Sequence, residues 1–375
     1  MKLLIDASNI KSGGGFTHLY ELLSNLDRRK LYFDAVSVVG GNQLDKLKYL
    51  DWLEIIQPEK LKQGGFIKET YWKLFEMPTL ASHYDLVFAP GGTFNSGNVR
   101  FVSMSQNMLV FQKEERGRYG SSFMKLRLVL LQMVQTRSFR NAAGIIFISD
   151  FAQNYIRQSI GNIKAMTTKI THGISSRFNG VVKVQKDIKS YSFESPFRFL
   201  YVSIIDVYKH QDKVISTVAK LNAAGYPVHL DLVGGAYPTE LEKLNPLLDT
   251  YPTIVSYHGL QSYDSIEKFY QHADAFIFAS SCENMPNILI EAMASGLPVA
   301  SSDMGPMKEF LQDAGFYFDP LDVTSMYTTI VKMLENKEER SEKASRALAL
   351  SGQYNWKKCA DETAGFLNKI SRQGS

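Results

Sequence analysis

Residues 275–300 have the sequence AFIFASSCENMPNILIEAMASGLPVA, which is the most informative segment of the chain. Its apolar start predicts a strand, its middle predicts a helix entered through a loop, and Pro298-Val299-Ala300 predicts the next strand. Glu283 and Glu291 lie on either side of the predicted helix entrance. Because open α/β sheets bind ligands at the carboxyl ends of their strands, we expect both acids to lie at a ligand site.

The predicted helix entrance is suited to an anion. The first four backbone N–H groups of a helix have no partner inside the helix, and the helix dipole makes that end positive. A phosphate group can bind there, and a carboxylate on each side can hold hydroxyl groups of the molecule that carries the phosphate. The pattern therefore predicts a nucleotide-sugar site, although two glutamates at this spacing also occur by chance in ordinary buried helices.

The rest of the chain predicts two α/β halves. Its 375 residues are enough for two domains of ordinary size, and the composition is that of a soluble globular protein. Apolar runs predict strands at 2–6, 32–39, 85–88, 99–104, 144–148, 197–202, 228–233 and 275–278. Helical segments alternate with these strands, which favours parallel sheets covered by helices. The polar segment 181–194 is interpreted as a linker.

A glycine-rich loop follows the first predicted strand. Gly13, Gly14 and Gly15 precede a helical pattern, and glycine permits both positive φ and close approach of the backbone to a ligand. The match to G-x-G-x-x-G is incomplete because His18 stands at the third glycine position. A dinucleotide site, and with it an NAD oxidoreductase, is therefore not favoured.

The charge distribution and the cysteine content indicate which partners and which cellular compartment to expect. Residues 1–182 contain 23 Lys and Arg against 14 Asp and Glu, whereas residues 183–375 contain 19 against 24. The basic first half predicts an anionic partner. Two cysteines indicate no disulfide framework, which fits a reducing cytoplasm. We find neither a secretory signal nor an apolar run long enough for a membrane span.

Residues 122–143 combine apolar side chains with Lys125, Arg127, Arg137 and Arg140. A basic amphipathic helix of this kind can lie on an anionic membrane surface. The alternative is a core helix with a charged outer face. Nucleic acid is not an expected partner, because Lys and Arg form no concentrated block.

The segment from Glu283 to Val299 resembles the E-x7-E segment of retaining GT-B glycosyltransferases of family 4. Other segments resemble motifs of that family in the same order, namely 171–174, 201–210, 308–315 and 354–356. The resemblance covers the second half well and the first half loosely. It implies an α/β fold of GT-B type, with two Rossmann-like domains facing across a cleft. Residues 1–182 and a returning C-terminal helix, 355–375, would bind the acceptor, and residues 183–354 the nucleotide-sugar.

The resemblance also implies roles for individual residues. Glu283 matches the acid that faces the donor sugar, and Glu291 matches the acid that holds the ribose hydroxyls. Lys209 matches the lysine that neutralises the leaving phosphate. The loop residues that meet the diphosphate correspond to Asn284, Met285 and Asn287, together with Gly14 and Gly15 of the first half.

Two departures from the family pattern stand out. The family commonly has an Arg a few residues before the lysine, where this chain has Ile204. Either another cation replaces it or donor binding is weaker. A His often lies near the reacting sugar, where this chain has Ser105-Gln106-Asn107. Asn107 and His172 are therefore candidate contacts to the donor sugar or acceptor, with a structural turn and a satisfied loop histidine as the alternatives.

The expected function is transfer of a hexose-type sugar, with retention, from a nucleoside-diphosphate-sugar to a glycan or glycolipid acceptor. The acceptor is expected to be lipid-linked, in cell-surface polysaccharide or lipopolysaccharide synthesis, and the protein to be cytoplasmic and peripheral on the membrane. No cofactor is expected. The chain contains no Asp-x-Asp, so a metal-independent reaction is predicted. A nucleotide-sugar epimerase and an inactive nucleotide-sugar-binding subunit on the same fold remain alternatives.

Overall fold

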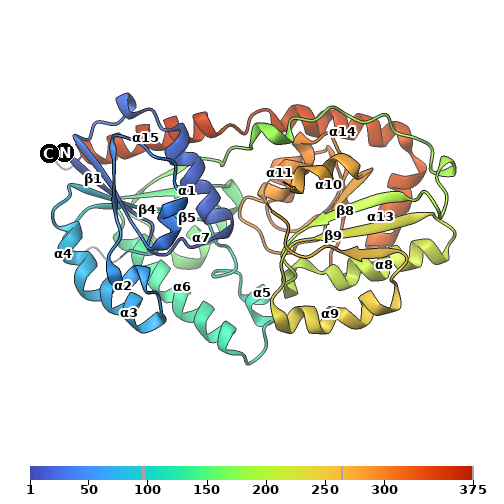
Figure 1. Cartoon of the computed structure of the whole chain (residues 1–375), viewed down its shortest axis with the longest axis horizontal. Helices are drawn as coiled ribbons and strands as arrows, with labels where there is room; N and C mark the ends of the chain where they lie inside the picture. Colours follow the sequence, from blue (N-terminus) through green and yellow to red (C-terminus); the bar gives the residue numbers. More distant parts are fainter. Residues whose placement is uncertain (95–97, 263–264, 374–375) are drawn as a thin grey trace. The chain divides into compact units, whose positions relative to one another are not determined.

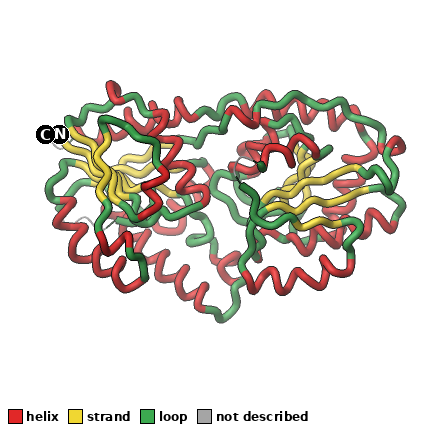
Figure 2. The backbone as a smooth tube through the Cα atoms, viewed as in Figure 1, coloured by secondary structure: helices red, strands yellow, loops and turns green. Residues whose placement is uncertain are grey.

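The computed structural model describes residues 1–94, 98–262 and 265–373, and contacts group the chain into two compact units (Figures 1 and 2). The first unit contains Met1–Phe111, Ser121–Gly173 and Tyr354–Ser375. The second contains Gln112–Gly120 and Ile174–Gln353. The segment Gln112–Gly120, here called the strap, was expected in the first domain but belongs to the second unit.

The first unit is built on a seven-stranded parallel sheet in the order β3-β2-β1-β4-β5-β6-β7. Its strands are β1 (Lys2–Asp6), β2 (Ala35–Val39), β3 (Leu53–Ile56), β4 (Leu86–Ala89), β5 (Phe101–Ser105), β6 (Gly144–Phe147) and β7 (Met166–Lys169). Parallel strands covered on both faces are apolar throughout, and every residue of β4 and β5 is buried. The chain order reverses between β1 and β4.

The α-helices of the first unit are α1 (Gly13–Asn25), α2 (Glu59–Lys62), α3 (Phe66–Tyr71), α4 (Met77–Ala81), α6 (Phe123–Asn141), α7 (Asp150–Ile160) and α15 (Trp356–Arg372). Three of them begin at residues that can cap a helix. The side chains of Ser122, Ser149 and Asn355 accept hydrogen bonds from the N–H groups of Lys125, Ala152 and Lys358. Such caps satisfy donors that the helix itself leaves unpaired.

Helix α15 completes the first unit although it lies at the end of the chain. It contacts α1, and Lys30 forms an ion pair of 2.7 Å with Asp361. A Cβ atom at Gly144, at the start of β6, would lie 2.9 Å from the Phe366 ring. The helix and the sheet are therefore in direct contact, and Phe366 and Ile370 belong to the core of this unit.

The second unit contains a six-stranded parallel sheet in the order β10-β9-β8-β11-β12-β13. Its strands are β8 (Phe197–Val202), β9 (Val228–Val233), β10 (Val255–Tyr257), β11 (Ala275–Phe278), β12 (Val299–Ser302) and β13 (Gly315–Phe318). Its α-helices are α5 (Lys113–Gly117) in the strap, α8 (Gln211–Ala223), α9 (Pro238–Thr250), α10 (Ile266–His272), α11 (Asn287–Ala294), α12 (Met307–Leu311), α13 (Val323–Glu335) and α14 (Lys337–Ser351). The chain order reverses between β8 and β11.

The two sheets place their carboxyl-terminal loops at the positions where ligands bind in open α/β folds. Within the described residues, no helix is both long enough and apolar enough to cross a bilayer. Cys282 and Cys359 are free and buried.

Candidate active site

Two loops meet at the point where the strand order of the second sheet reverses. One follows β8 and leads through a 3-10 turn, η6 (Val207–Lys209), into α8, and the other follows β11 and leads into α11. The N–H group of Ser281 donates a 2.9 Å hydrogen bond to the carbonyl oxygen of Tyr208, which joins the loops. This junction lies at the carboxyl ends of adjacent strands, and it carries the predicted catalytic residues.

Lys209 and Glu283 form an ion pair across the junction. The Nζ atom of Lys209 donates a hydrogen bond to Oε1 of Glu283. The lysine is only 5% exposed, and its ammonium group lies 4.9 Å from the centre of the Tyr208 ring. A buried charge is tolerated only when it is paired. The fold therefore brings together two residues that are 74 positions apart in the sequence.

The backbone beside Lys209 is fixed by a second network. His210 adopts the left-handed conformation, with φ of 52°, and its Nε2 atom lies 2.8 Å from Oγ of Ser281. Ser281 donates a 2.6 Å hydrogen bond to Oε2 of Glu115 in the strap, which leaves the serine oxygen to accept from the imidazole. Arg118 donates to the same carboxylate oxygen at 2.8 Å. Burial, and after it the charge of Arg118, lowers the pKa of His210.

A second strap residue contacts the loop after β8. The hydroxyl of Tyr119 donates a 2.8 Å hydrogen bond to Oδ1 of Asp206. The same oxygen accepts from the N–H group of Val207 and so begins the turn that carries Lys209. Burial raises the pKa of both Tyr119 and Asp206. The strap thus contacts both loops that carry the predicted catalytic pair.

Helix α11 begins directly after the Glu283 loop. Pro286 is its first flanking residue and makes no side-chain cap hydrogen bond, and its first turn contains no acid. Asn284 and Met285 are 4% and 7% exposed and line the approach to Asn287. The helix dipole makes this end positive. The predicted diphosphate residues thus lie together at a helix entrance beside Lys209.

Glu291 lies on α11, with its carboxylate in the interior although the residue as a whole is partly exposed. The hydroxyl of Tyr270 donates a 2.9 Å hydrogen bond to Oε2 of Glu291. Burial raises the pKa of Glu291 to about 7, and the Tyr270 hydrogen bond and the charge of Arg177 oppose this shift. The carboxyl group is therefore poised to change its charge near neutral pH.

The candidate residues of the first unit form a separate group. Gly13 begins α1 with φ of 66°, a conformation that favours glycine, and a Cβ atom at Gly14 would meet no atom within 4 Å. A Cβ atom at Gly15 would lie 3.5 Å from Oε1 of Gln106. Asn107 accepts a 3.0 Å hydrogen bond from the N–H group of Leu109, which is a local turn contact.

His172 lies inside the first unit rather than on its surface. It is 4% exposed, and its ring stacks on His18 at 4.6 Å and on Trp356 at 5.6 Å. Burial, with a smaller contribution from His172, lowers the pKa of His18 well below its usual value. His172 is thus packed between two rings of the first unit.

Sequence reasoning missed Tyr270, Ser281, His210 and the strap residues Glu115 and Arg118. His210 directly follows Lys209, and that adjacency was the available signal. The strap contacts could not be inferred from the sequence, because Glu115 and Ser281 are 166 positions apart. Ile204, at the place of the missing Arg, is 38% exposed and brings no charge to the site.

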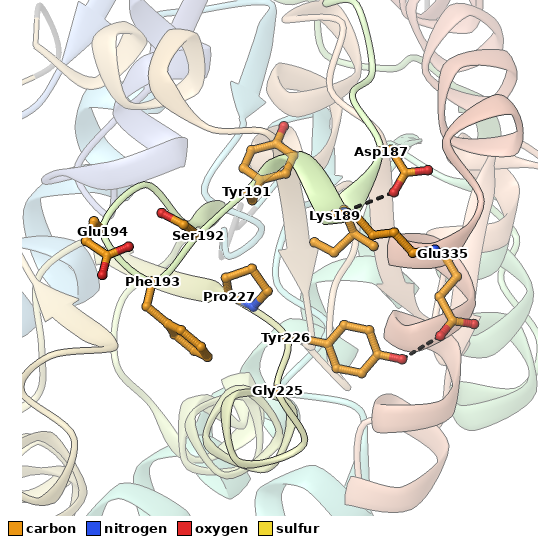
Figure 3. A pocket seen from close by; sticks show the side chains of 11 residues that line it. Asp187, Lys189, Tyr191, Ser192, Phe193, Glu194, Gly225, Tyr226, Pro227 and Glu335 are labelled. Atoms are coloured by element: carbon orange, nitrogen blue, oxygen red, sulfur yellow. Dashed lines mark hydrogen bonds between the residues drawn. The ribbon is translucent and has the colours of Figure 1, made fainter.

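A different cavity, of about 720 Å³, lies at the amino-terminal ends of the strands of the second sheet (Figure 3). Residues 187–194, which precede β8, and Gly225, Tyr226 and Pro227, which precede β9, line it. Tyr226 donates a hydrogen bond of 2.5 Å to Glu335 on one of its walls. Because it lies at the amino ends of these strands, we assign the site to the loops of Lys209 and Glu283 instead.

Comparison with known proteins shows which proteins the chain resembles. Residues 183–348 match the model of the family described as "Glycosyl transferases group 1". A curated relative, O-antigen chain mannosyltransferase B of Escherichia coli, is 29% identical over 109 residues, which are 29% of this chain and 29% of the relative. The chain thus aligns with less than a third of that relative's length.

Solved structures resemble the whole chain. Anabaena HepE in complex with UDP and glucose has a TM-score of 0.71 and 19% identity, with 98% of this chain and 100% of that chain covered. WaaG, described as a glycosyltransferase involved in lipopolysaccharide biosynthesis, has a TM-score of 0.70 and 15% identity, with 98% and 99% covered. The predicted α/β fold with two Rossmann-like, parallel-sheet domains is therefore confirmed, and GT-B glycosyltransferases share it.

Proposed function

We propose that this chain, whose residues 183–348 match the model of the glycosyl transferases group 1 family, is a glycosyltransferase that uses a nucleoside-diphosphate-sugar as donor. The observation that carries the proposal is the pairing of Lys209 with Glu283 beside the entrance of α11. It combines a cation, a positive helix end and a carboxylate at one ligand-binding position. The solved HepE complex contains UDP and glucose, which supports a donor of this class.

In the proposed reaction, Lys209 and the N–H groups at the start of α11 stabilise the negative charge that develops on the departing diphosphate. Preorganised groups of this kind, directed at developing charge, are often the largest contribution to catalysis. Because the chain supplies this positive charge itself and has no Asp-x-Asp, we propose that the reaction is metal-independent. The resemblance to family 4 enzymes supports retention of configuration.

The two carboxylates have separate proposed roles. Glu283 accepts hydrogen bonds from hydroxyl groups of a hexose-type donor sugar while Lys209 turns toward the diphosphate. Glu291 accepts from the ribose hydroxyls, and Tyr270 holds its carboxylate in one orientation. The other candidate residues lie in the first unit, namely Gly14, Gly15, Asn107 and His172. Of these, we propose that the glycine loop contacts the donor. His172 stacks on His18 of α1, the helix that begins at the glycine loop.

We propose a glycan acceptor, linked to lipid, in the synthesis of a cell-surface polysaccharide or lipopolysaccharide. The relative named for an O-antigen chain and the WaaG structure support this class. Such an acceptor would place the protein in the cytoplasm, on the inner face of the cell membrane.

The test replaces Glu283 with Gln and measures transfer to membrane-extracted glycolipid together with nucleotide-sugar affinity. We expect transfer to fall about a hundredfold or more, with the nucleotide still bound. Glu335→Gln is the matched control, because Glu335 lines the cavity at the opposite, amino-terminal ends of the strands. A panel of nucleotide-sugars would identify the donor, since a bound ligand raises the unfolding temperature by mass action.

Full transfer by Glu283→Gln, or a wild-type protein that binds no nucleoside diphosphate, would contradict the proposal. The second result would support an inactive subunit. Conversion of the donor sugar to its epimer in the absence of acceptor would support the epimerase alternative.

A further inference from the structure

Helix α6 exposes an apolar row on its outer face. Phe123, Leu126, Leu130, Met133 and Val134 are between 52% and 82% exposed. Their spacing of three, four, three and one residues places them on one side of a helix. The buried positions of the same helix are Leu128, Gln135, Ser138 and Phe139, of which two are polar. The apolar row is exposed although two of the buried positions are polar, so burial in this unit does not explain the apolar row.

The same outer face is positively charged. Lys125, Arg127, Arg137 and Arg140 are all exposed, and the sequence of α6 contains no Asp or Glu. Among the described residues, the side chains of Lys125, Arg127 and Arg137 have no hydrogen bond or ion pair, and Arg140 donates only to the carbonyl oxygen of Ile160, at 2.9 Å. On a helical projection, Arg127 and Arg140 border the apolar row, and Arg137 lies within it.

A hollow of about 420 Å³ lies along the C-terminal half of α6. Gln132, Met133, Thr136, Arg137 and Arg140 line it, together with Asn141. It places two guanidinium groups and an apolar side chain next to each other. Guanidinium groups bind phosphate oxygens in a planar, bidentate geometry, so the hollow offers a phosphate position at the edge of the apolar row.

We propose that the outer face of α6 lies flat on a bilayer that contains anionic phospholipid. Its apolar row enters the boundary between headgroups and acyl chains, and its cations bind lipid phosphates, with one phosphate between Arg137 and Arg140. Amphipathic helices with an apolar face and a basic polar face bind membranes in this way, and each Lys or Arg near an anionic surface adds attraction.

A bilayer fits this face better than a second copy of the chain does. A symmetric dimer through α6 would bring identical surfaces together, and hence the three arginines of one copy against the same three arginines of the other. The apolar row alone would allow such a dimer, but the charge opposes it. An anionic bilayer satisfies both features at once.

The test uses the full chain and co-sedimentation with vesicles. We expect binding to vesicles of phosphatidylcholine mixed with phosphatidylglycerol, weak binding to phosphatidylcholine alone, and weaker binding as salt screens the charges. Arg127→Gln combined with Arg137→Gln should weaken binding about thirtyfold, or about fivefold for each cation. Lys46→Gln combined with Lys48→Gln is the matched control, because it removes two exposed, unpaired charges elsewhere in the same unit.

Leu126→Gln combined with Leu130→Gln should weaken binding at least tenfold by removing buried apolar area, whereas Val184→Gln combined with Leu260→Gln should not, although both residues are more than 80% exposed. Equal binding to neutral and anionic vesicles, or wild-type binding by both α6 variants, would overturn the proposal. A dimer that dissociates in Leu126→Gln without any vesicle binding would also overturn it. Vesicle binding requires no sugar donor, so this outcome is independent of the proposed transferase activity.

Discussion

Glu291 and Glu283 lie on the same stretch of chain, but their carboxyl groups have different partners. Glu283 is paired with the ammonium group of Lys209, whereas Glu291 accepts from the neutral phenol of Tyr270. An ammonium group stabilises a carboxylate much more than a phenol does. At the scale of single residues, burial raises the pKa of Glu291 to about 7, and the hydrogen bond from its neutral partner Tyr270 offsets only part of that shift.

The first prediction concerns pH and stability. In the folded chain the pKa of Glu291 is about 7, whereas the ordinary pKa of a glutamate side chain is 4.5. Between these values the folded state binds more protons than the unfolded state, so its stability falls as pH rises. The loss is complete above about pH 7 and amounts to roughly 3 kcal/mol.

Glu291→Gln removes this loss, because glutamine keeps an oxygen for Tyr270 and has no charge to bury. We expect the variant to be more stable than the wild type at alkaline pH and similar to it at acidic pH, in denaturant unfolding without ligand. It should also bind the nucleotide more weakly. A stability difference that does not change with pH would refute this account of Glu291.

The second prediction concerns the ion pair. Lys209→Met leaves the largely buried carboxylate of Glu283 without its counter-charge, and we expect a loss of about 3 kcal/mol. The double variant Lys209→Met with Glu283→Gln should recover part of that loss, because no uncompensated charge remains. Unfolding of the two single variants and the double variant measures this coupling.

Lys243→Met is the control for the ion-pair prediction. Lys243 forms a surface ion pair with Glu240, and such pairs contribute less than about 1 kcal/mol. Strictly additive losses would argue against coupling.

At the scale of elements, the strap is the feature that joins distant parts of the sequence. Through Glu115, Arg118 and Tyr119 it contacts the loop after β8 and the loop after β11. Arg118 also brings a cation near His210, next to Lys209, where Ile204 brings none. The strap therefore contributes to the geometry of a site whose other parts all lie in the second half of the chain.

The third prediction tests the strap. Glu115→Ala removes the buried carboxylate that accepts from the Ser281 hydroxyl and from the partly exposed Arg118, which should cost roughly 1 to 3 kcal/mol. It should also weaken nucleotide binding, because the backbone on either side of the Lys209–Glu283 pair loses support. Glu114→Ala is the matched control, since Glu114 is exposed and such changes usually alter stability by less than about 0.5 kcal/mol. If both variants bind nucleotide like the wild type, the strap does not position the site.

At the scale of the whole molecule, the first unit depends on the last segment of the chain. Trp356, Phe366, Leu367 and Ile370 of α15 are each at most 7% exposed. Burial of such side chains contributes about 1.5 to 3 kcal/mol each, and their sum is comparable with the total stability of a typical domain, about 5 to 15 kcal/mol.

The fourth prediction follows from that dependence. Deletion of residues 356–375 should unfold the first unit, because it uncovers α1 and the start of β6, while the second unit stays folded and still binds the nucleotide. Limited proteolysis would then cleave first within residues 1–111 and 121–173, which belong to the first unit. Substitution of Asp361 with Asn, which removes only the exposed ion pair with Lys30, is the control and should leave cleavage unchanged. Cleavage first in the second unit would contradict the prediction.

Local patterns were sufficient to locate much of the architecture. The strand over 197–202 was predicted with its exact bounds, and those over 228–233 and 275–278 likewise, because buried parallel strands are short, continuous apolar runs. β7 was missed, since Met166–Lys169 contains two threonines and a lysine and is only partly buried. β10 was missed because it has only three residues.

The linear order of residues was enough to specify the alternation of strands and helices, the placement of Glu283 and the glycine loop after strands, and that of Glu291 on the helix that follows. These features follow from local periodicity and from the geometry of parallel sheets. The pairing of Lys209 with Glu283, the strap on Ser281, the stack of His172 on His18 and the outward direction of the apolar row of α6 depended on the folded chain. Each of these features depends on packing between segments that are far apart in the sequence. A hydrophobic pattern records which residues share a face of a helix or strand, but only the surrounding core determines whether that face is buried.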